Sequence, residues 1–145
     1  MKSAIQKLWK SRSGASAVEF ALVMPLFLLM LFGMIEFGRL FWTSHALHDT
    51  AIATARCMGI PQMECEDGDV YSASKATTFA KATATGWFVA LDTASITLDH
   101  DASCHGLAGF SQVKISHEFN TLVPKLLTSL AGGTKLQAEA CYTNH

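Results

Sequence analysis

Hydrophobic residues are unevenly spread along the chain, and their longest run lies near the N-terminus. From Phe20 to Ile35 there is no charged residue, and Glu19 is the only one between Ala15 and Ile35. A helix needs about 20 apolar residues to cross the hydrocarbon core of a bilayer. The pattern therefore predicts one membrane-spanning helix.

The helical pattern continues beyond this run. Residues 39–58 contain neither proline nor glycine, and helical spacing places six small or apolar residues on one face: Leu40, Ser44, Leu47, Ala51, Ala55 and Met58. We predict a single helix from about Ala15 to Met58, about 65 Å long, of which about 30 Å crosses the hydrocarbon. Gly59 and Pro61 are expected to end it.

The residues on either side of the apolar run indicate its orientation in a membrane. Four basic residues and no acidic residue precede it: Lys2, Lys7, Lys10 and Arg12. By the positive-inside rule, this keeps the N-terminus in the cytoplasm and sends the rest of the chain outward. Phe41 and Trp42 follow the run, where aromatic side chains collect at the membrane–water interface.

A loop and a second helix are expected after the long helix. Residues 62–69 are acidic and include Cys65, which predicts an exposed loop tied back to the helix end. The Ala- and Thr-rich segment from about Tyr71 to Thr85 predicts a helix that Gly86 would stop.

The C-terminal third changes from a helical to an alternating period. Alternation predicts one strand around Ile96–Leu98 and another over Val113–Phe119. A short helix is expected after Pro124, followed by a turn at Gly132 and a last strand over Thr134–Tyr142.

Together these elements predict an α+β fold in which the long N-terminal membrane-spanning helix packs on a small three-stranded antiparallel sheet. So small a sheet needs a cover for its apolar face, and the outer half of the helix is the obvious one. We expect three regions: a cytoplasmic leader over residues 1–14, a membrane-spanning part over 15–38, and an outer domain over 39–145.

The charges and cysteines of the expected outer domain indicate its partners and its compartment. Of the 11 basic side chains, four belong to the leader, which leaves 7 basic and 12 acidic side chains for the rest of the chain. An acidic domain with no basic patch argues against nucleic acid as a partner. All four cysteines lie beyond the membrane segment, where an oxidising compartment would let them pair: Cys57, Cys65, Cys104 and Cys141.

Four cysteines allow three pairings, and the sequence alone does not choose among them. The predicted sheet does favour one. In a meander the end of the third strand lies beside the start of the second, so Cys141 comes near Cys104, while Cys57 and Cys65 are local to each other. We therefore expect the pairs 57–65 and 104–141.

The most specific motif is Gly14-Ala15-Ser-Ala-Val-Glu19-Phe20 at the head of the apolar helix. A carboxylate inside a membrane helix is costly, by about 2.5–3.5 kcal/mol at the bilayer centre and less near the ends. One interpretation is an interfacial Glu19 that the helix dipole tolerates. A secretory signal peptide is disfavoured, because the apolar run is long and ends without a small-x-small cleavage site.

The basic leader, the Gly14-to-Glu19 spacing and Phe20 resemble the type IV prepilin family. The resemblance implies cleavage between Gly14 and Ala15 by a prepilin peptidase of the inner membrane, with this chain as its substrate. It also implies that Glu19 pairs with the new N-terminal amine of a neighbouring subunit. That amine is mostly protonated at pH 7, so it could neutralise Glu19 inside an apolar bundle.

The longer string Arg12-Ser-Gly14-Ala-Ser-Ala-Val-Glu19-Phe-Ala-Leu-Val-Met-Pro25, with Gly33-Met-Ile-Glu36-Phe-Gly38-Arg39, is similar to the TadE and TadF pseudopilins of the tight adherence (Tad/Flp) system. These residues do not separate TadE from TadF. The resemblance implies a pilin-like fold and a minor pseudopilin of the inner membrane that works with other pilins and pseudopilins. Surface adhesion and biofilm formation are the implied outputs.

The sequence also bears on the possibility of an enzyme or a metal-binding protein. There is no glycine-rich phosphate loop, HExxH motif or nucleophile elbow, so neither catalysis nor a cofactor is expected. Two clusters invite a zinc hypothesis, His45/His48/Asp49 and His100/Asp101/Cys104/His105, but surface histidines are the preferred interpretation and no metal is expected. The alternative function is an uncleaved, membrane-anchored periplasmic binding or enzyme domain.

Overall fold

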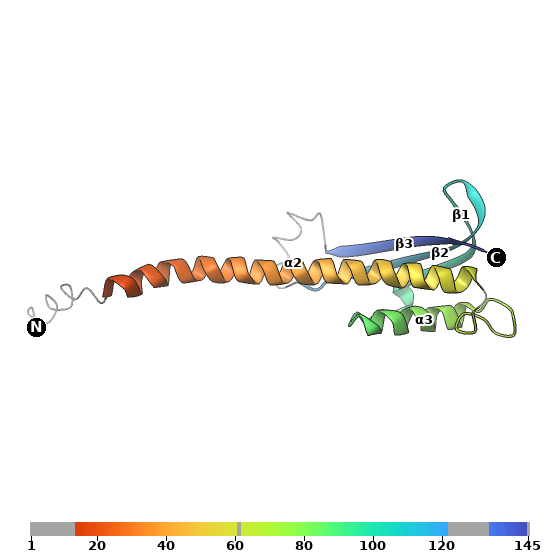
Figure 1. Cartoon of the computed structure of the whole chain (residues 1–145), viewed down its shortest axis with the longest axis horizontal. Coiled ribbons are helices and arrows are strands. Elements are labelled where there is room, and N and C mark those ends of the chain that lie inside the picture. Colours follow the sequence, from red (N-terminus) through yellow and green to blue (C-terminus); the bar gives the residue numbers. More distant parts are fainter. Residues whose placement is uncertain (1–13, 61, 122–133, 145) are drawn as a thin grey trace, which may run out of the picture. The chain divides into compact units, whose positions relative to one another are not determined.

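The computed structural model describes residues 14–60, 62–121 and 134–144. The chain divides into two compact units, residues 1–38 and residues 39–145, and each is described separately below. One helix, α2 (Ala15–Gly59), belongs to both (Figure 1). The expected bounds of a leader and a membrane span remain predictions, because they concern cleavage and insertion rather than contacts within the chain.

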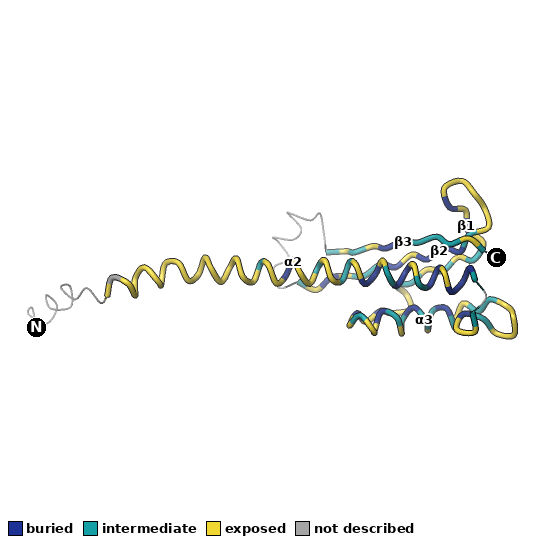
Figure 2. Tube along the Cα trace, in the orientation of Figure 1, coloured by how far each residue is buried: buried dark blue, intermediate teal, exposed yellow. Residues whose placement is uncertain are grey.

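The described part of the first unit is the N-terminal half of α2. Its side chains are almost all exposed, although most of them are large and apolar (Figure 2). Pro25 lies inside the helix, which continues through it. Membrane helices tolerate proline where neighbouring groups satisfy the freed carbonyl.

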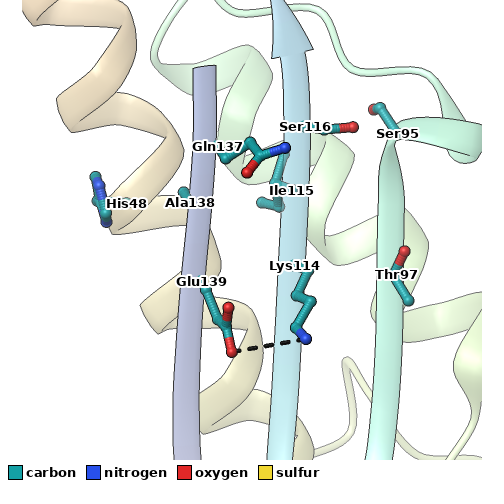
Figure 3. Close-up of a pocket in the computed structure, with 9 residues that line it drawn as sticks. All are labelled: His48, Ser95, Thr97, Lys114, Ile115, Ser116, Gln137, Ala138 and Glu139. Carbon is teal, nitrogen blue, oxygen red and sulfur yellow. Dashed lines mark ion pairs between the residues drawn. The ribbon is translucent and has the colours of Figure 1, made fainter. Parts of the chain in front are cut away.

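The second unit is a two-layer α+β domain, as the sequence pattern predicted. Its sheet has the antiparallel order β1 (Ile96–Cys104), β2 (Leu107–Glu118) and β3 (Lys135–Thr143). The C-terminal half of α2 and a second helix, α3 (Ala73–Gly86), lie behind the sheet in the view of Figure 3. A short 3-10 helix, η2 (Thr93–Ser95), leads into β1.

The core forms where both helices meet the sheet. The predicted face of α2 supplies Leu47, Ala51, Ala55 and Met58, all buried, while Leu40 and Ser44 are half-buried. The sheet contributes Val113, Ile115 and Ala138. Thr50 and Thr54 are also fully buried, and each hydroxyl donates to the carbonyl one turn earlier at 2.7 Å, so α2 satisfies these polar groups itself.

Helix α3 starts two residues later than predicted and ends one residue later. Tyr71 pairs with Glu66 in an isolated β-bridge, and the Ser72 amide donates to the Cys65 carbonyl, which delays the start. Gly86 is the last helical residue instead of the stop, because the left-handed residue that ends the helix is Phe88. Alanines spaced by four residues (Ala76, Ala80 and Ala84) are buried.

Strands β1 and β2 are longer than the alternation predicted, and the faces of the strands are as expected. The central strand β2 pairs Val113 with Leu98 and with Ala140. Phe119 lies just past the end of β2 but is still buried, and its amide donates to the Thr134 carbonyl at 2.8 Å. The last strand is shifted by one residue from the predicted Thr134–Tyr142. The expected helix after Pro124, the turn at Gly132 and the role of Pro61 lie outside the described residues.

Candidate functional site

The head of α2 carries the residues that the sequence singled out for processing and assembly. Gly14 directly precedes the helix, and Glu19 lies in its second turn with an exposed side chain. Phe20 is exposed as well. These residues are close to one another only because they follow one another along one helix, so the structure leaves their assigned roles as predictions.

Gly14 has no packing reason to be glycine in the described structure. A Cβ built there would meet no heavy atom within 4 Å, and its backbone does not adopt a left-handed conformation. The fold alone would accept a larger residue at this position.

The N-terminal half of α2 presents an apolar surface on all sides. Every large hydrophobic side chain from Val18 to Phe37 is more than a third exposed. The helix is long and apolar enough to cross a membrane, as judged by length and composition, and its most apolar 18-residue stretch has a mean hydropathy of 2.3. A helix that is hydrophobic all round belongs in a bilayer or among other helices.

Two disulfides cross-link the second unit. Cys57 pairs with Cys65 and Cys104 with Cys141, with S–S distances of 1.96 and 1.95 Å. This is the pairing that the predicted meander favoured. The first holds the loop after α2 against the helix end, and the second joins the end of β1 to β3.

Several polar side chains of the sheet surround a hollow (Figure 3). Lys114 and Glu139 form an ion pair at 3.8 Å, and Gln112 donates to Glu139 at 2.6 Å. The hollow has a volume of about 420 Å³ and is lined by His48, Ser95, Thr97, Lys114, Ile115, Ser116, Gln137, Ala138 and Glu139. An exposed ion pair of this kind adds little stability.

Several members of the two clusters that suggested zinc sites make other contacts in the structure. His45 pairs with Asp49 at 3.5 Å, while His100 stacks on Tyr71 and Cys104 is in a disulfide. Within residues 14–60, 62–121 and 134–144, no three His, Cys, Asp or Glu side chains are placed to share a metal ion.

A polar network that the sequence pattern did not reveal ties the three strands together. Ser111 on β2 is fully buried, lies 2.9 Å from His100 Nδ1, and donates to Asn144 Oδ1 at 2.7 Å. Asn144 Nδ2 donates back to the His100 carbonyl at 2.5 Å. Tyr71 covers His100, and its own burial, with a smaller contribution from the Asp99 carboxylate, raises the pKa of the Tyr71 phenol.

An aromatic cluster at the end of α3 was also missed in part. Trp42 was expected at a membrane interface, but Trp87 and Phe88 had no assigned role. In the structure the Trp42 and Trp87 rings meet edge to face at 5.6 Å, and Trp42 Nε1 donates to the Trp87 carbonyl at 3.1 Å. The signal in the sequence is the uncharged segment 82–91, which interrupts an otherwise polar region.

Comparison with known proteins bears on the helix that carries the candidate site. No curated protein and no solved structure matches the chain. A protein-family model described as TadE-like protein matches residues 14–56, which hold Gly14, Glu19, the apolar surface and most of α2. Over residues 14–56 the chain is therefore similar to the TadE-like family, which is associated with Tad pilus systems.

Proposed function

We propose that this chain is a minor pseudopilin of a Tad/Flp-type pilus, cut by a prepilin peptidase between Gly14 and Ala15. The observation that carries the proposal is the place of the motif. Gly14 and Glu19 stand at the head of an apolar helix inside the region that matches the TadE-like model, and no described residue lies within 4 Å of a Cβ built on Gly14. The chain is the substrate of the peptidase and is not an enzyme.

The apolar half of α2 supports storage in the inner membrane before assembly. Its exposed side chains suit lipid in the free subunit and the helices of other pilins in a filament. In both settings the cytoplasmic leader precedes the helix and the domain from residue 39 onward lies outside. Lateral transfer from lipid to a helical bundle leaves the apolar surface covered throughout.

Glu19 gives assembly its specificity. In an apolar bundle an unpaired carboxylate is costly, and cleavage creates a cationic amine at Ala15 that a neighbouring subunit can offer to it. The uncleaved chain has no such amine. Processing therefore licenses assembly, and the outer domain is then displayed on or near the filament, where it serves adhesion and biofilm formation.

The first test is N-terminal analysis of the membrane-bound protein by intact mass. We expect a chain that begins at Ala15, and we expect loss of this form when Gly14 is replaced by a bulky residue or the peptidase gene is deleted. Gly33→Ala is a matched control, because a Cβ there also meets nothing within 4 Å. A working assembly whose subunit still begins at Met1 would support an uncleaved membrane-anchored domain instead.

The second test separates cleavage from assembly. Glu19→Gln keeps the size of the side chain but removes its charge, so the mature chain should still form while its crosslinks to other pilins and surface attachment of the cells decline. Glu64→Gln, in the exposed loop after α2, changes charge equally without touching the apolar helix. Equal attachment by the Glu19 and Glu64 variants would contradict the role given to Glu19.

A further inference from the structure

Helix α3 ends in a tight hydrogen-bonded turn that puts Phe88 in an unfavourable position. The Phe88 amide donates to the Thr85 carbonyl at 2.9 Å, and the Val89 amide reaches back to the Ala84 carbonyl at 2.9 Å. This is the Schellman arrangement, in which the residue at the place of Phe88 is left-handed and most often glycine. Phe88 has a φ of 62°, which a bulky L-residue rarely adopts.

Packing of the Phe88 side chain against the described part of the chain does not compensate for this backbone conformation. It is 93% exposed, more than any other large hydrophobic side chain in the described part of the chain. Val89, the next residue, is buried in the same core cluster as Ala84, and an apolar contact between these two positions usually accompanies this turn. The turn is therefore complete without an aromatic ring at position 88, and glycine would fit its backbone better.

The turn is held at a defined level of α2. Trp42 Nε1 donates to the Trp87 carbonyl, and the two indoles are in edge-to-face contact. At the other end of α3, the Ser72 amide bonds Cys65, which is in turn disulfide-linked to Cys57 of α2. Helix α3 therefore runs antiparallel to the part of α2 that belongs to the second unit (Figure 1).

Distance along α2 places this level at a membrane interface. If the hydrocarbon begins near Phe20, about 20 residues bring its far edge to Arg39, and Trp42 lies about 5 Å further along the helix axis. Phe41 and Trp42 are themselves 74% and 54% exposed. Neither residues 82–91 nor residues 40–44 contain a charged side chain that would resist dehydration.

We propose that Phe41, Trp42, Trp87 and Phe88 form an interfacial patch that docks on the lipid headgroup and acyl boundary of the bilayer spanned by α2. Through Trp87 and Phe88 the patch gives the domain a second point of contact with the membrane, far from α2 in the sequence. Indole and phenyl rings suit this zone because they combine a large apolar surface with tolerance of nearby water. The free energy of inserting the Phe88 ring offsets its left-handed backbone.

We choose lipid over a protein partner because Phe41 and Trp42 follow the apolar segment directly along α2. The patch adjoins, along one helix, a surface that is already apolar enough to cross a bilayer. This proposal rests on α2 being in the membrane, as in the proposed function, but it is independent of cleavage at Gly14. A second subunit that covers Phe88 is the competing outcome of the test below.

The test uses the full chain in phosphatidylcholine vesicles, with trifluoromethyl-phenylalanine incorporated at position 88 or, as a matched control, at position 63. Met63 is 87% exposed and lies in the loop before α3, at the opposite end of that helix. Fluorine NMR then compares line broadening by a shallow nitroxide lipid with broadening by a soluble gadolinium chelate. Intact disulfides by peptide mapping verify the fold of both labelled chains.

We expect the signal at position 88 to broaden severalfold more with the nitroxide lipid than the signal at position 63, and the gadolinium chelate to reverse this order. The proposal is overturned if the two positions respond alike in vesicles. It is also overturned if position 88 is open to gadolinium in vesicles and becomes shielded only in assembled filaments, because the patch would then be a subunit contact. Neither result affects the N-terminal mass assay, so the proposed function is tested independently of this patch.

Discussion

Gly59, the last residue of α2, lies directly against the backbone of Thr143 near the end of β3. A Cβ built on Gly59 would lie 2.7 Å from the Thr143 carbonyl oxygen and 2.9 Å from Tyr142 Cδ1. Because the first of these atoms is backbone, it cannot simply swing aside. The helix end and the last strand approach so closely only because position 59 has no side chain.

Gly59→Ala should therefore destabilise the outer domain, by about 1–3 kcal/mol if the contact is relieved by shifting β3. Gly86→Ala is the matched control, since it lies within α3 with nothing near its Cβ, and it should stabilise by about 0.5–1 kcal/mol. Urea unfolding of the full chain in detergent micelles, followed by far-UV circular dichroism, measures both. Equal effects of the two substitutions would show that the Thr143 backbone can move away from a Cβ at position 59 without loss of stability.

The two disulfides should contribute unequally to stability. In the chain-entropy description, a cross-link that closes a longer loop constrains the unfolded chain more, which gives about 2.6 kcal/mol for Cys57–Cys65 and about 3.9 kcal/mol for Cys104–Cys141. The sequence separations are 8 and 37 residues. We expect the double substitution of Cys104 and Cys141 by alanine to lower the unfolding midpoint more than that of Cys57 and Cys65. The reverse order would place the larger contribution in native contacts around the first bridge.

Alkaline pH should weaken the domain through Tyr71. Burial, and to a smaller extent Asp99, raises the pKa of the folded phenol above its ordinary value of 10.0. Between the unfolded and folded pKa values only the unfolded chain ionises, so the stabilisation is complete below about pH 10 and is lost as the pH rises through the folded pKa.

Absorbance of tyrosinate at 295 nm checks this. Substitution of Tyr142 by phenylalanine leaves Tyr71 as the only tyrosine of the chain. Asp99→Asn should then lower the apparent pKa of Tyr71 only partly, because burial is the larger cause. A full return to the ordinary value would assign the shift to Asp99 alone.

Ser111→Ala should cost about 1–3 kcal/mol, because it leaves His100 Nδ1 and Asn144 Oδ1 without their shared partner. Ser116→Ala, on the same strand and only half-buried, is the control and should stay within about 0.5 kcal/mol. The comparison uses the same urea titration. Similar losses for the two serines would mean that the buried network is not selectively stabilising.

The fold was largely predictable because its main elements follow hydrophobic periodicity. The uninterrupted helical spacing from Leu40 to Met58 predicted the outer half of α2, and alternation through Val113 and Ile115 predicted the central strand. The disulfide pairing followed from the meander in turn. Each of these features depends on a repeat that neighbouring residues share.

The features that escaped prediction depend on single contacts and not on a repeating pattern. The start of α3 is set by bonds from Tyr71 and Ser72 to the loop around Cys65. Its end is set by the left-handed Phe88, whereas Gly86 was expected to stop the helix. The hydrogen bonds of Asn144 to strands β1 and β2 have no sequence pattern at all. Local spacing carries no information on such contacts.

The order in which the cysteines pair has a consequence for how the protein acquires its covalent structure. First joins second and third joins fourth, so each bridge closes within its own stretch of chain and the two never overlap. A chain oxidised progressively from its N-terminus would make the first native bond before either later cysteine appeared. Thiol–disulfide exchange then has to correct only those non-native bonds that form before the native partner is available. Maturation of this domain should therefore depend on an oxidant and hardly on an isomerase.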